Sequence, residues 1–294
     1  KQYPYRVENS KFVIENEGFE QGINFMILYD RETKRILNGT GDIYFSGIVT
    51  ENDDGTVTFS QSLTKYGLKK GDFMCLRGFT KPYPGVTIYR SINTVLDHVE
   101  IHSAEGMALL AQRSENVDII NSGVTYAKGR YTTTGADSSH FSNCKGQIRV
   151  ENNIFEGMMD DSFNIHQTSL KIKEIVNKTY IKLQYVHGQS VGFETILPGE
   201  QIRFIHSKTL ENDEFRNTTA VYKKSTTELE VALAAEIPST ISVGDSVENG
   251  VYYASVIFRN NTVRNNRARG CLFTTPLSIV VENNVFDYVS GSAI

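Results

Sequence analysis

Short runs of alternating apolar and polar residues recur along the chain, and most of them end in asparagine or serine. The clearest runs are Val99–Ser103, Val117–Ser122, Ile148–Ile154, Val256–Val263 and Ile279–Phe286. A period of two residues in β-branched sequence predicts strands. The polar ends of neighbouring runs lie 19, 31 and 23 residues apart, and no amphipathic helix pattern separates them. Strands repeating at roughly this interval predict a parallel β-helix, in which stacked coils share one core.

The asparagines fit the corners of such coils. Asparagine tolerates left-handed backbone angles, and its side-chain amide can form ladders from one coil to the next. A leucine-rich repeat is excluded because its Leu-x-x-Leu-x-Leu signature is absent. A β-sandwich is the alternative fold, since short alternating strands also build two packed antiparallel sheets.

Two stretches interrupt the repeat and divide the chain. Residues 26–80 and 170–248 are strand-rich without asparagine corners, and they contain turns of the Lys-Gly-Asp or Pro-Gly-Glu kind. This pattern predicts small antiparallel β-barrels. Coils are then expected over residues 1–25, 81–169 and 249–294. The second excursion leaves the coils beside an acidic cluster, where it would form one wall of a pocket; the alternative is that both excursions are purely structural.

Three aspartates make up that cluster. Asp160 and Asp161 are adjacent in the sequence, and Asp161 follows Asp137 by 24 residues, which is about one coil. The alternating apolar residues after each acid align at the same offset, so Asp137 should stack on Asp161. The same alignment, continued past the second excursion, places Arg269 over Asp161. Adjacent coils are about 4.8 Å apart, so the four side chains should meet.

Converging carboxylates can perform acid and base chemistry. Like charges raise one pKa and an arginine lowers another, and this difference separates a general acid from a general base. Aspartate also caps turns without any function, and clustered carboxylates also bind calcium. The convergence of three acids favours catalysis, and the nearby Arg269 disfavours a divalent cation, so no cofactor is expected.

Candidate substrate contacts surround the acids. Strand alternation turns His140, Asn164 and His166 away from the core, where they could bind sugar hydroxyls together with Arg269. Arg130 lies on the loop that enters the first acidic corner and is a further candidate. A solvated surface role is the simple alternative for each histidine and for Arg130.

Composition narrows the classes of partner. The net charge is −4 with a pI near 5.9, which argues against a nucleic-acid partner and against a polyanionic substrate. No apolar stretch reaches membrane-spanning length. Cys75, Cys144 and Cys271 lack metal-ligand spacing, so buried free thiols are expected. The chain begins at Lys1 without a signal peptide, so we expect it to be part of a longer protein.

The segments around the acids resemble glycoside hydrolase family 110. The similarity rests on Gly135-Ala-Asp-Ser-Ser-His-Phe-Ser-Asn-Cys-Lys-Gly146 and on Val150-Glu-Asn-Asn-Ile-Phe-Glu-Gly-Met-Met-Asp-Asp-Ser-Phe-Asn-Ile-His166. It implies a right-handed parallel β-helix with β-barrel excursions. It also implies an exo-acting α-1,3-galactosidase that inverts the anomeric centre without a metal, of the type that removes terminal galactose from blood group B antigens.

The resemblance also suggests roles and surroundings. Polygalacturonase-type β-helices place three aspartates similarly, and by that similarity Asp160 would be the acid while Asp137 and Asp161 would hold the water. Family members act on oligosaccharides or glycoconjugates, which suggests a secreted or periplasmic location. They are usually longer than this chain, so further coils are expected beyond residue 294.

Other functions remain alternatives at this stage. A polygalacturonase-like hydrolase would need a basic groove for uronates, which the net charge of −4 does not favour. A polysaccharide lyase would need a lysine or arginine base beside calcium. A non-catalytic carbohydrate-binding module, such as an adhesin, would need no convergent carboxylates.

Overall fold

The computed structural model describes a protein built almost entirely of strands. Its description covers residues 5–8, 11–15, 23–44, 49–54, 56–59, 64–69, 72–78 and 83–294. Within these ranges the only helices are two single 3₁₀ turns, η1 (Thr64–Tyr66) and η2 (Gly188–Ser190). None of the helices in this part of the chain is long and apolar enough to cross a membrane. The all-β class predicted from the alternating pattern is confirmed.

The N-terminal region holds two antiparallel sheets. The first has the order β1 (Tyr5–Glu8), β2 (Lys11–Glu15), β6 (Thr56–Phe59), β5 (Val49–Glu51). The second has the order β4 (Ile43–Tyr44), β3 (Ile23–Tyr29), β7 (Phe73–Gly78).

This arrangement corrects the expectation that residues 1–25 form coils. The strands β1 and β2 form an antiparallel hairpin that continues onto β6, which no parallel coil would do. A short alternating strand looks the same in a hairpin and in a coil, so the pattern alone did not separate them. Parts of the predicted 1–25 and 26–80 segments lie outside the described residues.

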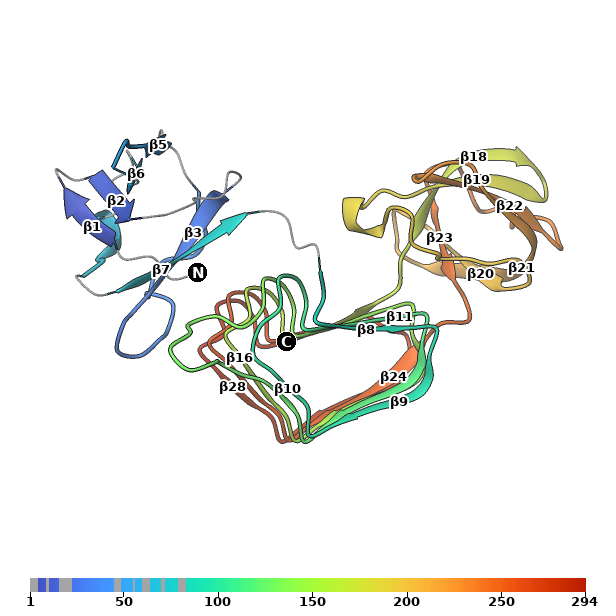
Figure 1. Cartoon of the computed structure of the whole chain (residues 1–294). Coiled ribbons are helices and arrows are strands. Elements are labelled where there is room, and N and C mark those ends of the chain that lie inside the picture. Colours follow the sequence, from blue (N-terminus) through green and yellow to red (C-terminus); the bar gives the residue numbers. More distant parts are fainter. Residues whose placement is uncertain are drawn as a thin grey trace.

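Three parallel five-stranded sheets follow, and each pass of the chain adds one strand to each sheet (Figure 1). The first sheet runs β10 (Glu100–Ile101), β13 (Gly123–Val124), β16 (Ile154–Glu156), β25 (Thr262–Arg264), β28 (Val285–Asp287). The second runs β8 (Val86–Tyr89), β11 (Leu109–Gln112), β14 (Ser139–Ser142), β17 (Phe163–His166), β26 (Cys271–Phe273). The third runs β9 (Ile92–Asp97), β12 (Glu115–Ile120), β15 (Lys145–Glu151), β24 (Ala254–Arg259), β27 (Ile279–Glu282).

The space between these sheets is one apolar core that contains closely packed aromatic rings. Phe163 lies 5.2 Å from Phe141, 5.5 Å from Phe258 and 5.1 Å from Phe273, measured between ring centroids. The first three of these phenylalanines are fully buried. Strands from successive passes of the chain therefore share one core. All three cysteines are free, and Cys144 and Cys271 are buried here.

Asparagines occupy the corners, as predicted. Asn121, Asn152 and Asn260 have φ between 50° and 59°, in the left-handed region. Their side chains form an exposed ladder, with Asn152 donating to Asn121 and Asn260 donating to Asn152, each at 3.3 Å. A second, buried ladder joins Asn153, Asn261 and Asn284.

A closed antiparallel barrel is inserted between β17 and β24. It consists of β18 (Leu170–Asn177), β19 (Tyr180–Gln184), β22 (Glu228–Leu233), β21 (Asn212–Lys223), β20 (Gln201–Ile205) and β23 (Ser246–Asn249), in spatial order. It has its own buried core, which includes Ile172, Leu183, Phe204, Val231 and Val247. The barrel and the N-terminal sheets both lie on the side of the coils that carries β8 and β11 (Figure 1).

Candidate active site

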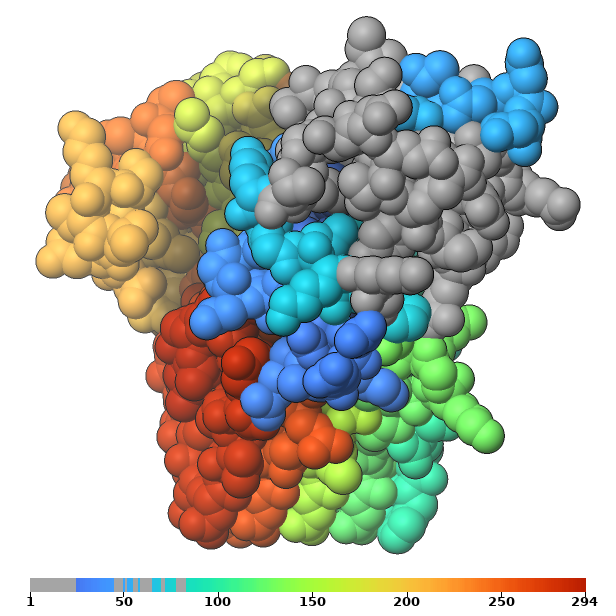
Figure 2. Space-filling view, turned by 90° about the vertical axis from the view of Figure 1, so that its left-hand side faces the viewer, coloured from blue at the N-terminus to red at the C-terminus, as the bar shows by residue number. Residues whose placement is uncertain are grey.

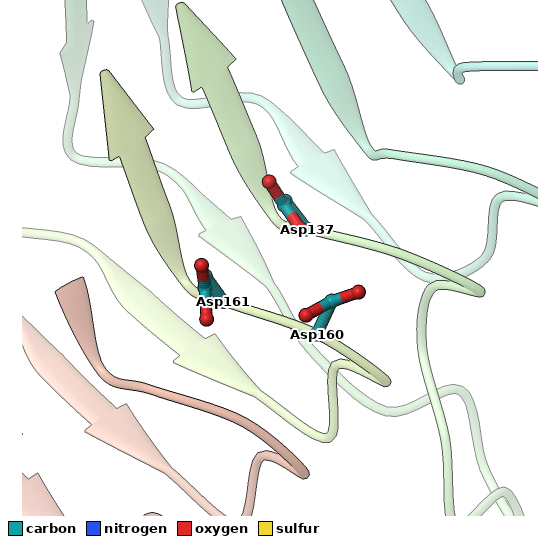
Figure 3. A group of neighbouring side chains, drawn as sticks. All are labelled: Asp137, Asp160 and Asp161. Atoms are coloured by element: carbon teal, nitrogen blue, oxygen red, sulfur yellow. The ribbon is translucent and has the colours of Figure 1, made fainter. Parts of the chain in front are cut away.

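The predicted stacking of the acids is confirmed by the strand register. The strand β17 pairs with β14 at an offset of 24 residues and with β26 at an offset of 108 residues. Asp137, Asp161 and Arg269 each lie two residues before one of these strands, so they fall in line across three coils. Figure 3 shows Asp137 and Asp161 at the starts of neighbouring strands, with Asp160 on the turn beside them. One oxygen from each carboxylate lies within 4.8 Å of the other two.

Asp161 is held by Arg269. The Arg269 backbone N–H and its Nε donate to Asp161 Oδ1 at 3.0 Å each, and Nη2 donates to Oδ2 at 2.8 Å. Asp161 is 1% exposed. Burial raises the pKa of Asp161, the Arg269 hydrogen bonds lower it, and the charges of Asp137 and Asp160 raise it further, with the net effect upward. The ion pair stabilises both charges, so the rise comes from burial and the neighbouring carboxylates rather than from the pair.

The burial of Asp161 and Asn164 corrects one expectation. Strand alternation places Phe163 and Ile165 in the core, as predicted, but the polar residue between them does not face solvent. Asn164 is only 9% exposed. Neighbouring coils and the Arg269 side chain cover this face, which alternation along one strand cannot reveal.

Asp137 begins a chain of hydrogen bonds through two histidines. Its Oδ2 lies 2.7 Å from His140 Nδ1, and His140 Nε2 lies 2.8 Å from His166 Nε2. His166 Nδ1 lies 2.8 Å from the carbonyl oxygen of Gln167. A carbonyl only accepts, so His166 Nδ1 carries a proton and donates it.

The protonation of this chain follows from its geometry. Burial, followed by the nearby His140, lowers the pKa of His166, so its ring is neutral and its Nε2 accepts. His140 therefore donates from Nε2, which leaves one proton between His140 Nδ1 and Asp137. Both ring nitrogens of each histidine are thus engaged by protein atoms. This geometry favours a role for His140 and His166 as proton partners of Asp137. Their contacts with sugar hydroxyls stay a prediction.

The other predicted contacts differ in position. Asn164 Nδ2 donates to Asp161 Oδ2 at 3.4 Å, while Asn164 Oδ1 is buried and has no hydrogen-bond partner among the described residues. An unpaired acceptor beside the acids is well placed to accept a hydrogen bond from a hydroxyl group.

Arg130 is exposed on the loop between β13 and β14, and the adjacent Tyr131 stacks on Phe73 of β7 at 3.8 Å. Its contact with substrate stays a prediction.

Asp160 is faced by an arginine that sequence reasoning missed. Arg267 Nη1 lies 4.0 Å from Asp160 Oδ1. Arg267 Nε donates to Asp42 Oδ1 at 2.6 Å, and its Nη2 donates to the second Asp42 oxygen. Asp42 comes from the N-terminal region, just before β4, and no repeat relates it to Arg267.

Arg77 on β7 ties both acidic corners to the N-terminal region. Its Nη1 donates to the Met159 carbonyl at 3.1 Å and its Nη2 to the Gly135 carbonyl at 2.6 Å. Arg77 is buried, and desolvation followed by the charge of Arg267 lowers its pKa. In Figure 2 blue residues of the N-terminal region lie against the red, orange and green parts of the chain. No sequence signal links Arg77 to the acids, because its strand belongs to a separate antiparallel sheet.

The carboxylates have a spacing that a cation could use, but their oxygens are engaged. Both Asp161 oxygens accept from Arg269, and one Asp137 oxygen faces His140. A divalent cation at this place would also meet the guanidinium of Arg269. The donor set therefore suits acid and base chemistry better than cation binding.

Comparisons with known proteins point the same way. The GLAA-B β-barrel domain I family model matches residues 1–74, and the GLAA-B β-barrel domain II family model matches residues 180–247. An α-1,3-galactosidase B of Akkermansia muciniphila is 45% identical over 296 residues, which span 100% of this chain and 37% of that protein. The chain is therefore similar to α-1,3-galactosidases over its whole length. The resemblance to glycoside hydrolase family 110 is thereby confirmed.

Further members of the α-1,3-galactosidase family align over nearly the whole chain. The α-1,3-galactosidase B of Parabacteroides distasonis is 38% identical over 99% of the chain and 49% of its own length. One from Phocaeicola vulgatus is 37% identical over 99% of the chain and 51% of its own length. The chain thus spans about half the length, or less, of the curated relatives it matches.

Proposed function

We propose that the protein containing this chain is an exo-acting α-1,3-galactosidase that removes terminal α-linked galactose from glycans. The observation that carries this proposal is the register of β14, β17 and β26, which gathers three carboxylates and Arg269 at one place. The relatives named α-1,3-galactosidase B support the choice of galactoside. A secreted or periplasmic location fits an enzyme acting on such glycans.

We further propose that the three parallel sheets are the faces of a right-handed parallel β-helix. The support is that each coil contributes one strand to every sheet, in register with its neighbours. In such a helix the strand starts of successive coils form a rigid row, which suits a catalytic site.

The roles of the acids follow from their surroundings. Asp160 is a quarter exposed and would donate a proton to the glycosidic oxygen. Asp137 and Asp161 would together hold the water that attacks the anomeric carbon, and Asp137, next to His140, would take its proton. Asn164 Oδ1 would accept a hydrogen bond from a galactose hydroxyl.

The stereochemical outcome has two candidates. The resemblance favours inversion, which uses carboxyl groups about 6.5–9.5 Å apart. The closest oxygens here are within 4.8 Å, nearer to the roughly 5–5.5 Å of retaining enzymes. Inversion is the leading candidate because Asp137 and Asp161 would act as one water-binding base, with Asp160 on the other side of the bond.

The test is product analysis by NMR with the full-length protein. It is incubated with α-1,3-linked galactosides, with and without a fucose branch, and the first anomer released is recorded. β-Galactose appearing first supports inversion, and α-galactose appearing first supports retention. Cleavage of polygalacturonate without cleavage of galactosides would contradict the proposed substrate and favour the alternative hydrolase.

A further inference from the structure

An exposed aromatic ring lies where the N-terminal region meets the acids. Tyr44, the last residue of β4, is 57% exposed, whereas Ile43 before it is buried. Residues two apart in an extended chain share a face, so Tyr44 projects on the same side as Asp42. Asp42 accepts a hydrogen bond from Arg267 Nε at 2.6 Å. Tyr44 is therefore on the side of the N-terminal region that faces Arg267.

The electrostatics of Arg267 give the same placement. Its hydrogen bonds to Asp42 contribute most to the raised pKa of Arg267, and the nearby Asp160 and Tyr44 raise it further, against the effect of burial. Arg267 Nη1 lies 4.0 Å from Asp160 Oδ1. Tyr44 and Asp160 thus lie around the same guanidinium.

The Tyr44 ring is supported from beneath. It pairs with Phe25 across β3 and β4, and the two ring centroids lie 5.5 Å apart with 36° between the planes. The Phe25 ring in turn lies 5.0 Å from the Arg77 guanidinium and 5.8 Å from that of Arg267. Phe25 is buried, whereas more than half of the surface of Tyr44 is in solvent. An exposed ring on such a packed support is a preformed contact surface.

The acid cluster is most open at Asp160. The Asp160 side chain is 25% exposed, against 7% for Asp137 and 1% for Asp161. In the proposed mechanism Asp160 protonates the glycosidic oxygen, so the sugar that leaves lies next to it. Pyranose rings carry an apolar face of C–H groups, which packs on aromatic rings because both surfaces then leave water. Tyr44 has the exposure and the position for that contact.

We propose that Tyr44 stacks on the departing sugar, which is the residue joined to the terminal galactose in the glycan. The inference rests on the proposed function, in which Asp160 is the general acid. It specifies what this side of the site recognises: the face of a pyranose ring. The aromatic ring of Tyr44 supplies the contact, and its hydroxyl group is not needed. Stacking of this kind adds affinity and leaves the chemical step to the acids.

The experiment compares two substrates that differ in the leaving group, using the full-length protein. One is an α-1,3-galactosyl disaccharide. The other is α-galactosyl fluoride, which releases fluoride and has no second sugar to stack. In Tyr44→Ala, kcat/KM for the disaccharide should fall roughly 3- to 10-fold, mainly through a higher KM, and kcat/KM for the fluoride should fall far less. Tyr44→Phe should recover the loss on the disaccharide, because the ring is kept.

Two further variants complete the comparison. Tyr222→Ala is the matched control, because Tyr222 is 52% exposed on β21 of the inserted barrel, and its loss should change neither substrate. Tyr44→Leu serves if the alanine variant does not fold. Leucine keeps an apolar contact with Phe25 but has no flat ring, so KM for the disaccharide should rise as in Tyr44→Ala.

Three results would overturn the inference. Equal losses on both substrates would mean that Tyr44 serves the galactose itself or the fold. A disaccharide KM as low in Tyr44→Ala as in Tyr222→Ala would mean that the ring makes no contact with the departing sugar. A Tyr44→Phe enzyme as impaired as Tyr44→Ala would assign the effect to the hydroxyl group. Failure of the proposed function looks different, because the wild type would then release galactose from neither substrate.

Discussion

Asp161 is a buried acid whose pKa is raised by its surroundings. Burial and two neighbouring carboxylates raise its pKa even though Arg269 binds both of its oxygens. A carboxyl whose pKa is raised by folding stabilises the protein below its unfolded pKa of about 3.8, and this stabilisation is lost as the pH rises through the folded value. At neutral pH an ionised Asp161 therefore lowers the free energy of unfolding, and its retention would be explained by a catalytic role.

Asp161→Asn should accordingly stabilise the fold while removing activity. We expect the thermal midpoint at pH 8 to rise by roughly 2–4 °C, and the gain to vanish near pH 3, where Asp161 is protonated in both states. Galactoside hydrolysis should fall by about 10²-fold or more. Thermal melts at the two pH values check the first part. A lower midpoint at pH 8 would mean that the Arg269 pair outweighs burial.

The three acids should also differ in their response to the leaving group. Asp160→Asn should lose about 10²-fold or more in rate on a disaccharide, and less on nitrophenyl galactoside, whose leaving group needs little protonation. Asp137→Asn and Asp161→Asn should be impaired equally on both substrates. Steady-state rates on the two substrates are the measurement. Selective rescue of Asp161→Asn by nitrophenyl galactoside would reverse the assigned roles.

At the scale of elements, the asparagine ladders hold the coils in register. Asn261 is 1% exposed, and its Oδ1 accepts from the backbone and side chain of Asn153. Its Nδ2 donates to the Val150 carbonyl at 2.9 Å and to Asn284 at 3.2 Å. The neighbouring Asn260 has a φ of 55° and belongs to the exposed ladder. The two adjacent asparagines thus differ: Asn261 bonds within the buried ladder, whereas Asn260 adopts the left-handed backbone angle and its side-chain bond is exposed.

Asn261→Ala should be costly and Asn260→Gly nearly neutral. The alanine removes the acceptor of the buried Asn153 backbone N–H and the side-chain donor to the Val150 carbonyl, which costs on the order of 2–4 kcal/mol. Glycine adopts the left-handed angle of residue 260 without strain. Hydrogen exchange of the β15, β24 and β27 amides measures the effect. Equal protection in both variants would show that the buried ladder adds nothing to register.

At the scale of the whole molecule, the inserted barrel is attached to the coils through a buried arginine. Arg113, on the corner after β11, is 3% exposed. Its Nη1 donates to the carbonyls of Glu194 at 2.9 Å and Thr195 at 3.2 Å, and its Nη2 donates to the Glu200 carboxylate. Its guanidinium also lies 4.6 Å from the ring of Tyr252. One coil residue therefore contacts the barrel at several points.

Arg113→Met should loosen this attachment without unfolding the coils. Methionine keeps much of the volume, but it leaves Glu200 without its buried partner, a loss of about 3–5 kcal/mol locally. We expect faster hydrogen exchange over residues 193–201 and unchanged exchange in β12 and β15. If the barrel moves relative to the site, KM for galactoside should rise as well. Unchanged exchange at residues 193–201 would show that other contacts suffice.

The sequence by itself determined how the parallel strands β14, β17 and β26 align. Its two-residue alternation and its spacing of 24 and 108 residues predicted the register of β14, β17 and β26, and with it the row of Asp137, Asp161 and Arg269. Repetition makes this possible, because each coil is built on the one before and shares its core. The asparagine corners follow from the same local rule, since residue type and backbone angle are coupled at a single position.

Only the tertiary structure decided what surrounds that row. Asp42 and Arg267 are 225 residues apart, and Arg77 reaches Met159 from a sheet that shares no repeat with the coils. The burial of Asp161 and the histidine chain from Asp137 also depend on which surfaces meet. The N-terminal sheets and the parallel sheets do not repeat each other, so the contacts between them depend on their shape and charge after folding. Shape and charge produce no periodic pattern in the sequence.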